Sequence, residues 1–123
     1  MSSTFAPPMS TPAMAASMRA RLRSMASSTV IIAEPGVGTS ALATEAARAA
    51  IAQAGLTPAD ITFLVVGTTT PDTIFPSTAC LLQHKIGATK AWGFDLGAAC
   101  SGFTYALTTG MQMVATGSTD RAL

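Results

Sequence analysis

Charged residues are scarce in this 123-residue chain. Seven Lys and Arg and six Asp and Glu make up 11% of the sequence, and the formal net charge is +1. A nearly neutral chain gives no argument for binding to nucleic acid or to an anionic membrane. Hydrophobic residues reach 49%, so we expect a buried α/β core or an oligomer, with much of the surface covered by other protein.

Histidine and cysteine are scarce as well. The sequence has one histidine, His84, and two cysteines, Cys80 and Cys100. Two cysteines do not make a disulfide framework, and nothing implies an oxidising compartment, so we expect a cytoplasmic protein. Cys80 and His84 lie one helical turn apart, but a metal site needs more ligands, so we expect no metal. We interpret Cys80 as a packed apolar residue and His84 as a surface or interface residue.

Long apolar runs and nucleotide-binding loops are also absent. The apolar runs are short and are broken by Gly, Thr and Pro, which argues against a membrane-spanning helix. Gly36 and Gly38 are not followed by the residues of a phosphate-binding loop or of a dinucleotide fingerprint. Neither type of nucleotide site is therefore indicated.

Acidic residues are absent before Glu34, in a segment rich in Ser, Ala, Met, Pro and Arg. We expect a leader over residues 1–29 with little fixed structure, apart from a short helix around residues 14–25, and a domain over residues 30–123. The composition of the leader is that of an organelle transit peptide. Because composition is a weak signal, we favour the alternative that it is translated sequence upstream of the true domain.

The rest of the sequence alternates helix-like and strand-like segments. An alanine-rich helix is predicted from a cap at Thr39 or Ser40 to about Ala54, with Gly55 as its stop. The nearly continuous apolar run at 61–66 predicts a strand buried on both faces of a parallel sheet. A one-turn helix start is predicted at 57–60, with Thr57 as its cap and Asp60 facing the free amides. A helix is predicted at 77–86, capped at Ser77 and stopped at Gly87. Further elements are predicted at 91–94 (strand), up to about 116 (helix) and 121–123 (strand start). This order predicts an α/β fold, a mostly parallel sheet with packed helices.

Cys100 stands where the strand at 91–94 turns into the last helix, among small residues. A sharp turn of this kind lets a sulfur stand clear and lets a substrate approach the backbone closely. Unpaired N–H groups at a helix start favour a thiolate, the reactive form of cysteine, and can also hold a developing oxyanion. Cys100 is therefore a candidate nucleophile; the alternative is a small buried residue at a tight crossing.

Several short stretches, in order and with matching spacing, carry a resemblance to a known family. They are AAR at 46–48, AGLTPADI at 54–61, TPD at 70–72, FPSTAC at 75–80, IGA at 86–88 and FDLGAACSGFTYAL at 94–107. From about Pro35 to Leu123 the chain resembles the amino-terminal half of β-ketoacyl-acyl-carrier-protein synthase III. The resemblance implies a fragment of a thiolase-like fold.

The resemblance implies a function in fatty acid biosynthesis. In the family, the cysteine that matches Cys100 is acylated by an acyl-CoA substrate, and malonyl-carrier-protein then loses CO2 and condenses with the acyl group. No cofactor is implied. Phe75 matches a position that reaches across a homodimer interface and bounds the acyl pocket of the partner, and Thr69 matches the loop near that interface. We expect both to be substrate-binding residues.

The resemblance also defines what this chain lacks. The family's catalytic histidine and asparagine lie in the carboxyl-terminal half, and His84 is not at the matching position. The expected protein is therefore a truncated acyltransferase. Two alternatives stay open: a non-catalytic, dimer-forming fragment, and a related polyketide or quinolone-type condensing enzyme.

Overall fold

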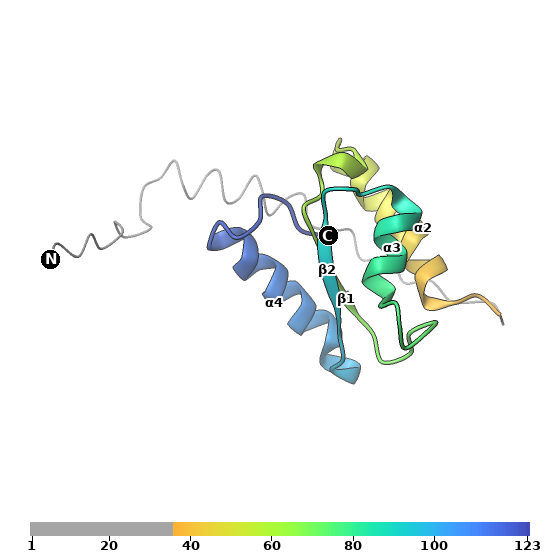
Figure 1. The fold of residues 1–123 in the computed structure, drawn as a ribbon. Helices are drawn as coiled ribbons and strands as arrows, with labels where there is room; N and C mark the ends of the chain where they lie inside the picture. Colours follow the sequence, from red (N-terminus) through yellow and green to blue (C-terminus); the bar gives the residue numbers. More distant parts are fainter. Residues whose placement is uncertain (1–35) are drawn as a thin grey trace, which may run out of the picture.

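The computed structural model describes residues 36–123 (Figure 1). The leader predicted over residues 1–29, with its short helix, and the apolar run at 30–33 lie outside the described residues. The elements follow in the order α2 (Thr39–Gln53), η1 (Pro58–Asp60), β1 (Phe63–Gly67), α3 (Thr78–Ile86), β2 (Trp92–Leu96), η2 (Ala99–Ser101) and α4 (Gly102–Ala115). Apart from η2, which forms within the predicted turn at Cys100, their types match the predicted ones, and their ends differ from them by up to about two residues.

The sheet is parallel, as predicted. β1 pairs with β2 in a register that sets Phe63 opposite Trp92 and Gly67 opposite Leu96. The last residues of the chain lie along the other edge of β1, where the Leu123 amide donates to the Phe63 carbonyl over 2.9 Å. A parallel bridge joins Phe63 to Ala122. The strand start predicted at 121–123 therefore forms, and β1 is the central strand of the described sheet.

Helices cover both faces of the sheet (Figure 1). α3 packs on β1 and β2 with α2 beside it, whereas α4 packs on the opposite face of β1. Because side chains alternate along a strand, Leu64 enters the core under α2 and α3, and Phe63 enters the core under α4. Both are fully buried. The prediction of a strand buried on both faces holds at the start of β1, while Val65 and Val66 are half-buried.

The helix ends combine local and distant signals. α3 has the predicted cap: the Ser77 hydroxyl accepts the Cys80 amide over 3.3 Å, and Gly87 ends the helix in a left-handed conformation at φ 79°. The predicted cap of α2 is wrong. Its N-cap residue is Gly38, and no side chain at that position caps the helix. The acceptor is a distant carboxylate, that of Asp72, to which the Ser40 amide donates over 3.1 Å.

A second distant carboxylate holds the start of α3. The Asp95 oxygens accept the Thr78 and Ala79 amides, each over 2.7 Å. Asp95 belongs to β2 and lies on the same face as Leu64, toward α3. The carboxylate therefore satisfies two amides that have no partner within the helix.

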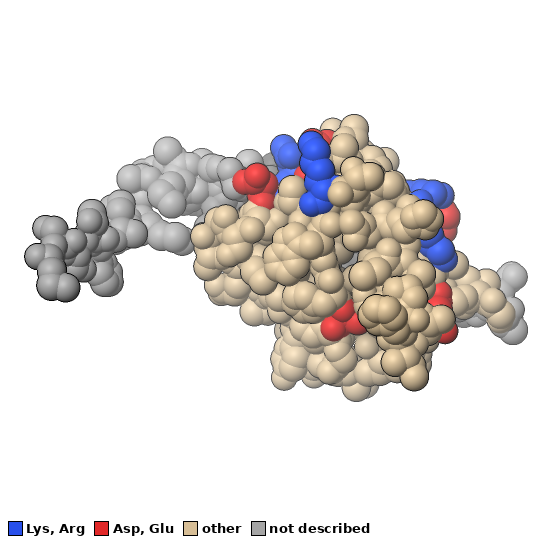
Figure 2. Space-filling model, in the orientation of Figure 1, with Lys and Arg blue, Asp and Glu red and all other residues tan. Residues whose placement is uncertain are grey.

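Apolar side chains also occupy exposed positions. The ring centroids of Trp92 and Phe94 lie 4.7 and 5.6 Å from the ring centroid of Phe63. Trp92 is nevertheless 48% exposed. On α4, Phe103 is 64% and Tyr105 56% exposed. Most of the face in Figure 2 is uncharged, with one acidic patch in its lower middle and the other charged side chains toward the rim. None of the helices within residues 36–123 has the length and hydrophobicity needed to cross a bilayer.

Replacing Asp95 should destabilise the fold. We expect Asp95→Ala to lower the free energy of unfolding by about 2 kcal/mol, because two amides of α3 lose their acceptor. Urea titration followed by Trp92 fluorescence measures this loss. Glu45→Ala is the control, because Glu45 forms only an exposed pair with Arg48 at 3.8 Å, worth less than about 1 kcal/mol. Equal losses in the two variants would contradict the capping role.

The exposed apolar face should drive self-association. We expect the 123-residue polypeptide to form dimers or larger assemblies, and Phe103→Lys to weaken them about 30-fold, because a buried aromatic side chain contributes ~2 kcal/mol. Sedimentation velocity over a concentration series measures this. Thr104→Lys adds the same charge at the next exposed position of α4 and serves as the control. A monodisperse monomer for the unsubstituted chain would refute the expectation.

Candidate active site

Cys100 lies in η2, the turn that joins β2 to α4, and its side chain is exposed. The residue before it, Ala99, has φ 43°. A positive φ is uncommon for a residue with a Cβ and costs about 1–2 kcal/mol. Backbone strain of this kind often accompanies functional sites, where the surrounding structure holds it. The strand-to-helix turn predicted around Cys100 is confirmed, and the alternative of a buried cysteine is not.

The end of β1 supports this turn through a close approach of two backbones. A Cβ on Gly67 would lie 2.8 Å from the Gly102 carbonyl oxygen and 2.9 Å from its carbon. No real side chain fits there, so only glycine at position 67 lets α4 begin directly against the end of the strand. The Ser101 amide donates to the Ala98 carbonyl over 2.9 Å and closes the turn. Cys100 thus stands on a backbone that is held from two sides.

The start of α4 has no side-chain cap, in contrast to α3. At α3, Asp95 and Ser77 occupy three amides of the first turn. At α4, the Gly102 amide donates to the Ala99 carbonyl of η2, and no side chain caps the helix. The partial positive charge of this helix start is therefore not offset by a bonded carboxylate. This arrangement suits a site where negative charge develops on sulfur or on a carbonyl oxygen.

The loop after β1 lies at the same end of the sheet as the Cys100 turn (Figure 1). The Thr68 amide donates to the Leu96 carbonyl over 3.1 Å, which ties the two strand ends together. Thr69 follows and is exposed. Farther along, Phe75 is 90% exposed, and its peptide bond to Pro76 is cis. The parallel sheet therefore brings the predicted residues Thr69 and Cys100 to one edge, and substrate binding by Thr69 and Phe75 stays a prediction.

The expectation for Cys80 is wrong. Its side chain is exposed on α3, and its sulfur lies 3.2 Å from the Ser77 hydroxyl. The face that α3 turns toward the core begins with Thr78 and Ala79, and Cys80 lies just past it.

Within residues 36–123, no group of three or more His, Cys, Asp and Glu side chains is placed to hold a metal ion.

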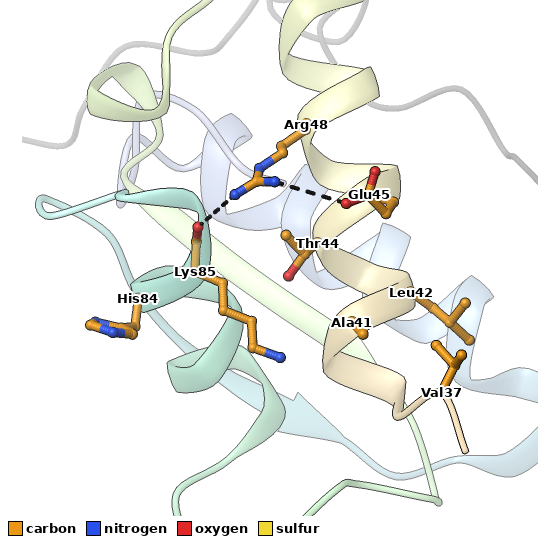
Figure 3. A pocket seen from close by; sticks show the side chains of 8 residues that line it. All are labelled: Val37, Ala41, Leu42, Thr44, Glu45, Arg48, His84 and Lys85. Carbon is orange, nitrogen blue, oxygen red and sulfur yellow. Dashed lines mark hydrogen bonds and ion pairs between the residues drawn. The ribbon is translucent and has the colours of Figure 1, made fainter.

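His84 is exposed, as expected, and lines a groove between α2 and α3 (Figure 3). The groove has a volume of about 540 Å³. The Arg48 guanidinium beside it donates to the Lys85 carbonyl over 3.1 Å and pairs with Glu45. His84 therefore belongs to the face of the sheet opposite α4, away from Cys100. The structure does not bring His84 and Cys100 together.

A second groove, which sequence reasoning missed, lies between β1, α4 and the end of the chain. Its volume is about 240 Å³. The lining residues are apolar, namely Val65, Gly67, Phe103, Ala106, Leu107, Gly110, Ala122 and Leu123. Spacing on α4 was the available signal, because Phe103 and Leu107 are four residues apart and share a face with Gly110. The contribution of the last residues depends on tertiary structure and has no local signal.

Comparison with known proteins yields consistent matches. Residues 94–123 match the family model of 3-oxoacyl-[acyl-carrier-protein] synthase III. The β-ketoacyl-[acyl-carrier-protein] synthase III of Koribacter versatilis is 48% identical over 92 residues, which are 75% of this chain and 28% of that protein. The chain thus spans about a quarter of the length of such relatives, less than the half that the sequence suggested.

Solved structures match as well. The 3-oxoacyl-[acyl-carrier-protein] synthase III of Aquifex aeolicus aligns with a TM-score of 0.67 and 39% identity, over 72% of this chain and 28% of that one. The priming β-ketosynthase of the R1128 polyketide pathway aligns with a TM-score of 0.68 and 39% identity, over 72% of this chain and 26% of that one. These matches confirm the resemblance, and the fold is a fragment of the thiolase-like fold.

Cys100 should react with thiol reagents faster than Cys80. Both are exposed and both lie near a helix start, but the amides of α3 are already bonded to a carboxylate and a hydroxyl, whereas those of α4 have no side-chain cap. Brief iodoacetamide treatment followed by peptide mass spectrometry measures the two rates. Cys80→Ala controls for labelling of the second thiol. Equal rates, or faster labelling of Cys80, would argue against Cys100 as the nucleophile.

Proposed function

We propose that this chain is part of an acyltransferase of the β-ketoacyl-acyl-carrier-protein synthase III type, acting in fatty acid biosynthesis. The Cys100 thiolate attacks the carbonyl carbon of an acyl-CoA thioester, the C–S bond to CoA breaks, and CoA leaves as its thiolate. The acyl group is then held as a thioester on Cys100. The observation that carries the proposal is the exposed cysteine on a strained turn, before a helix start without a side-chain cap.

The second half of the proposed reaction is a decarboxylative condensation. Malonyl-acyl-carrier-protein loses CO2, and the carbanion formed attacks the acyl carbon on Cys100, which releases a 3-oxoacyl product and the free thiol. Such a step is helped by groups that stabilise the developing enolate. The chain has one histidine, His84, and it lines the groove between α2 and α3. Condensation therefore depends on groups other than His84.

The remaining parts of the proposal concern assembly and location. We propose a cytoplasmic homodimer in which Phe75 bounds the acyl pocket of the partner and Thr69 lies near the shared interface. The exposure of Phe75 (90%) and of its neighbour Ile74 (98%) supports an interface there, because large apolar side chains gain from being covered. No cofactor is required, since acyl-CoA is a substrate.

Two other functions remain candidates. A polyketide-type priming enzyme is favoured by the similarity to the R1128 β-ketosynthase, at the same 39% identity as the Aquifex aeolicus enzyme. The two differ in acyl substrate rather than in the chemistry at Cys100. A non-catalytic, dimer-forming fragment is supported by the exposed apolar residues alone, and acylation of Cys100 would exclude it.

The 123-residue polypeptide should be acylated slowly and should not condense. Each missing oxyanion donor typically lowers the rate ~100- to 1000-fold, and each missing acid–base group lowers it by about 100-fold or more. The assay incubates radiolabelled acetyl-CoA with malonyl-acyl-carrier-protein and follows label on the protein and in product. Cys100→Ala should lose the protein-bound label, whereas Cys80→Ala should keep it.

The results that would contradict this expectation are specific. Label that survives in Cys100→Ala would reject Cys100 as the acyl carrier. Condensation product that depends on Cys100 would show that the 123-residue polypeptide holds a complete catalytic site.

A further inference from the structure

The connecting loop, residues 68–77, joins β1 to α3 and carries both Thr69 and Phe75. At its beginning, the Thr68 amide bonds to Leu96 beside the Cys100 turn. At its end, the Asp95 carboxylate holds the first amides of α3. Both anchors belong to β2. The position of Phe75, which lies between these two anchors, therefore depends on the contacts that hold the middle of the loop.

Two residues in the middle of the loop, Thr70 and Asp72, contact the start of α2. The Asp72 oxygens accept the Ser40 amide over 3.1 and 3.2 Å, and they also accept the Ser40 hydroxyl. Nearby, the Thr39 hydroxyl donates to the Thr70 carbonyl over 2.6 Å. These bonds fasten the loop to the start of α2, where unpaired amides favour a carboxylate.

The side chains around Asp72 are arranged for this contact. Ser40 is fully buried, and its hydroxyl oxygen accepts the Lys85 ammonium over 2.6 Å while the hydroxyl donates to Asp72. Lys85 extends from α3 beside α2 (Figure 3). A Cβ on Gly38 would lie 2.7 Å from an Asp72 carboxylate oxygen, so the missing side chain makes room for it. The Ser40 hydroxyl and amide hold the pKa of the Asp72 carboxyl below its usual range, because both donate to the charged form.

Beyond Asp72, the loop has few contacts before α3. Ile74 and Phe75 are 98% and 90% exposed, and the bond from the Thr73 hydroxyl to the Pro76 carbonyl, 3.0 Å long, stays within the loop. Asp72 is thus the last side chain that anchors the loop to another element before Phe75. Residues 73–77 form an arch between this anchor and the start of α3.

We propose that Asp72 is a positioning residue for the acyl-transfer site, through which the start of α2 fixes the arch that carries Phe75. This inference rests on the proposed function for its consequence, namely that the arch binds the acyl group. Loss of the anchor should loosen the arch and weaken acyl-CoA binding, and it should leave the attack by Cys100 itself unchanged, because the Cys100 turn is held by β1 and β2 instead.

The test compares Asp72→Ala, Asp72→Asn, Gly38→Ala and the control Asp60→Ala. Asn keeps one acceptor oxygen, and Ala at position 38 displaces the carboxylate without removing it. Asp60 is a matched control, because it also caps a helical turn and also has a lowered pKa, through the hydroxyl and amide of Thr57. It precedes β1, at the opposite end of the strand from the Cys100 turn.

Two readouts separate positioning from general stability. Hydrogen exchange followed by mass spectrometry should show residues 68–76 exchanging about tenfold faster in Asp72→Ala and in Gly38→Ala than in the unsubstituted chain. The increase should be smaller in Asp72→Asn. In Asp60→Ala, exchange over residues 68–76 should not change. The acyl-CoA concentration for half-maximal acylation of Cys100 should rise about tenfold in Asp72→Ala, while the maximal rate stays within about twofold.

Unchanged exchange over residues 68–76 in both Asp72→Ala and Gly38→Ala would overturn the proposal. A fall in the maximal rate of acylation with no change in the half-saturating acyl-CoA concentration would also overturn the proposal. That pattern would mean that Asp72 acts in the chemical step or in the stability of the whole fold. A wild-type chain that is not acylated would refute the proposed function, and exchange would then still decide whether Asp72 holds the arch.

Discussion

The architecture depends on a carboxylate of β2, Asp95, that bonds the first two amides of α3 at 2.7 Å. A helix N-terminus has four amides without intrahelical partners, and burying them unpaired is costly. Because Asp95 is five residues before Cys100, one short segment both anchors α3 on one face of the sheet and leads into the nucleophile turn on the other. The position of α3, and with it the end of the loop that carries Phe75, is coupled to the strand that presents Cys100.

The three longer helices within residues 36–123 have different starts, and we relate the difference to function. α2 and α3 begin on carboxylates supplied by Asp72 and Asp95, from other parts of the chain. α4 begins on a tight turn with no side-chain cap, next to Cys100. Capping stabilises a helix but fills the site where an anion would bind. The Gly102 amide donates to the Ala99 carbonyl of η2 instead. We interpret the missing side-chain cap at α4 as leaving the positive end of the helix without a competing carboxylate, so that it can favour negative charge at Cys100.

Sequence reasoning predicted the elements that have local signals. Ser77, Gly87 and the Thr57–Asp60 pair cap or stop their helices as expected, because these effects act over a few residues. It failed where a distant partner decides. The cap of α2 comes from Asp72, 32 residues away, and nothing near Gly38 predicts it.

The two cysteines show the same limit. The turn around Cys100 was predicted from its small residues, but the positive φ of Ala99 was not, since alanine gives no signal for it. Cys80 was expected to be packed because most free cysteines are, and its exposure depends on how α3 is rotated against the sheet. The reactivity of Cys100 must therefore be argued from the helix start, because exposure does not distinguish the two thiols.

An oxyanion formed at Cys100 in open water would gain little from nearby amides, because water screens them. Phe103, 64% exposed and three residues after Cys100, needs a protein cover for a different reason, the burial of its apolar surface. We infer that one covering surface meets both needs, so the scarcity of charge in this sequence and the openness of its nucleophile have a common cause.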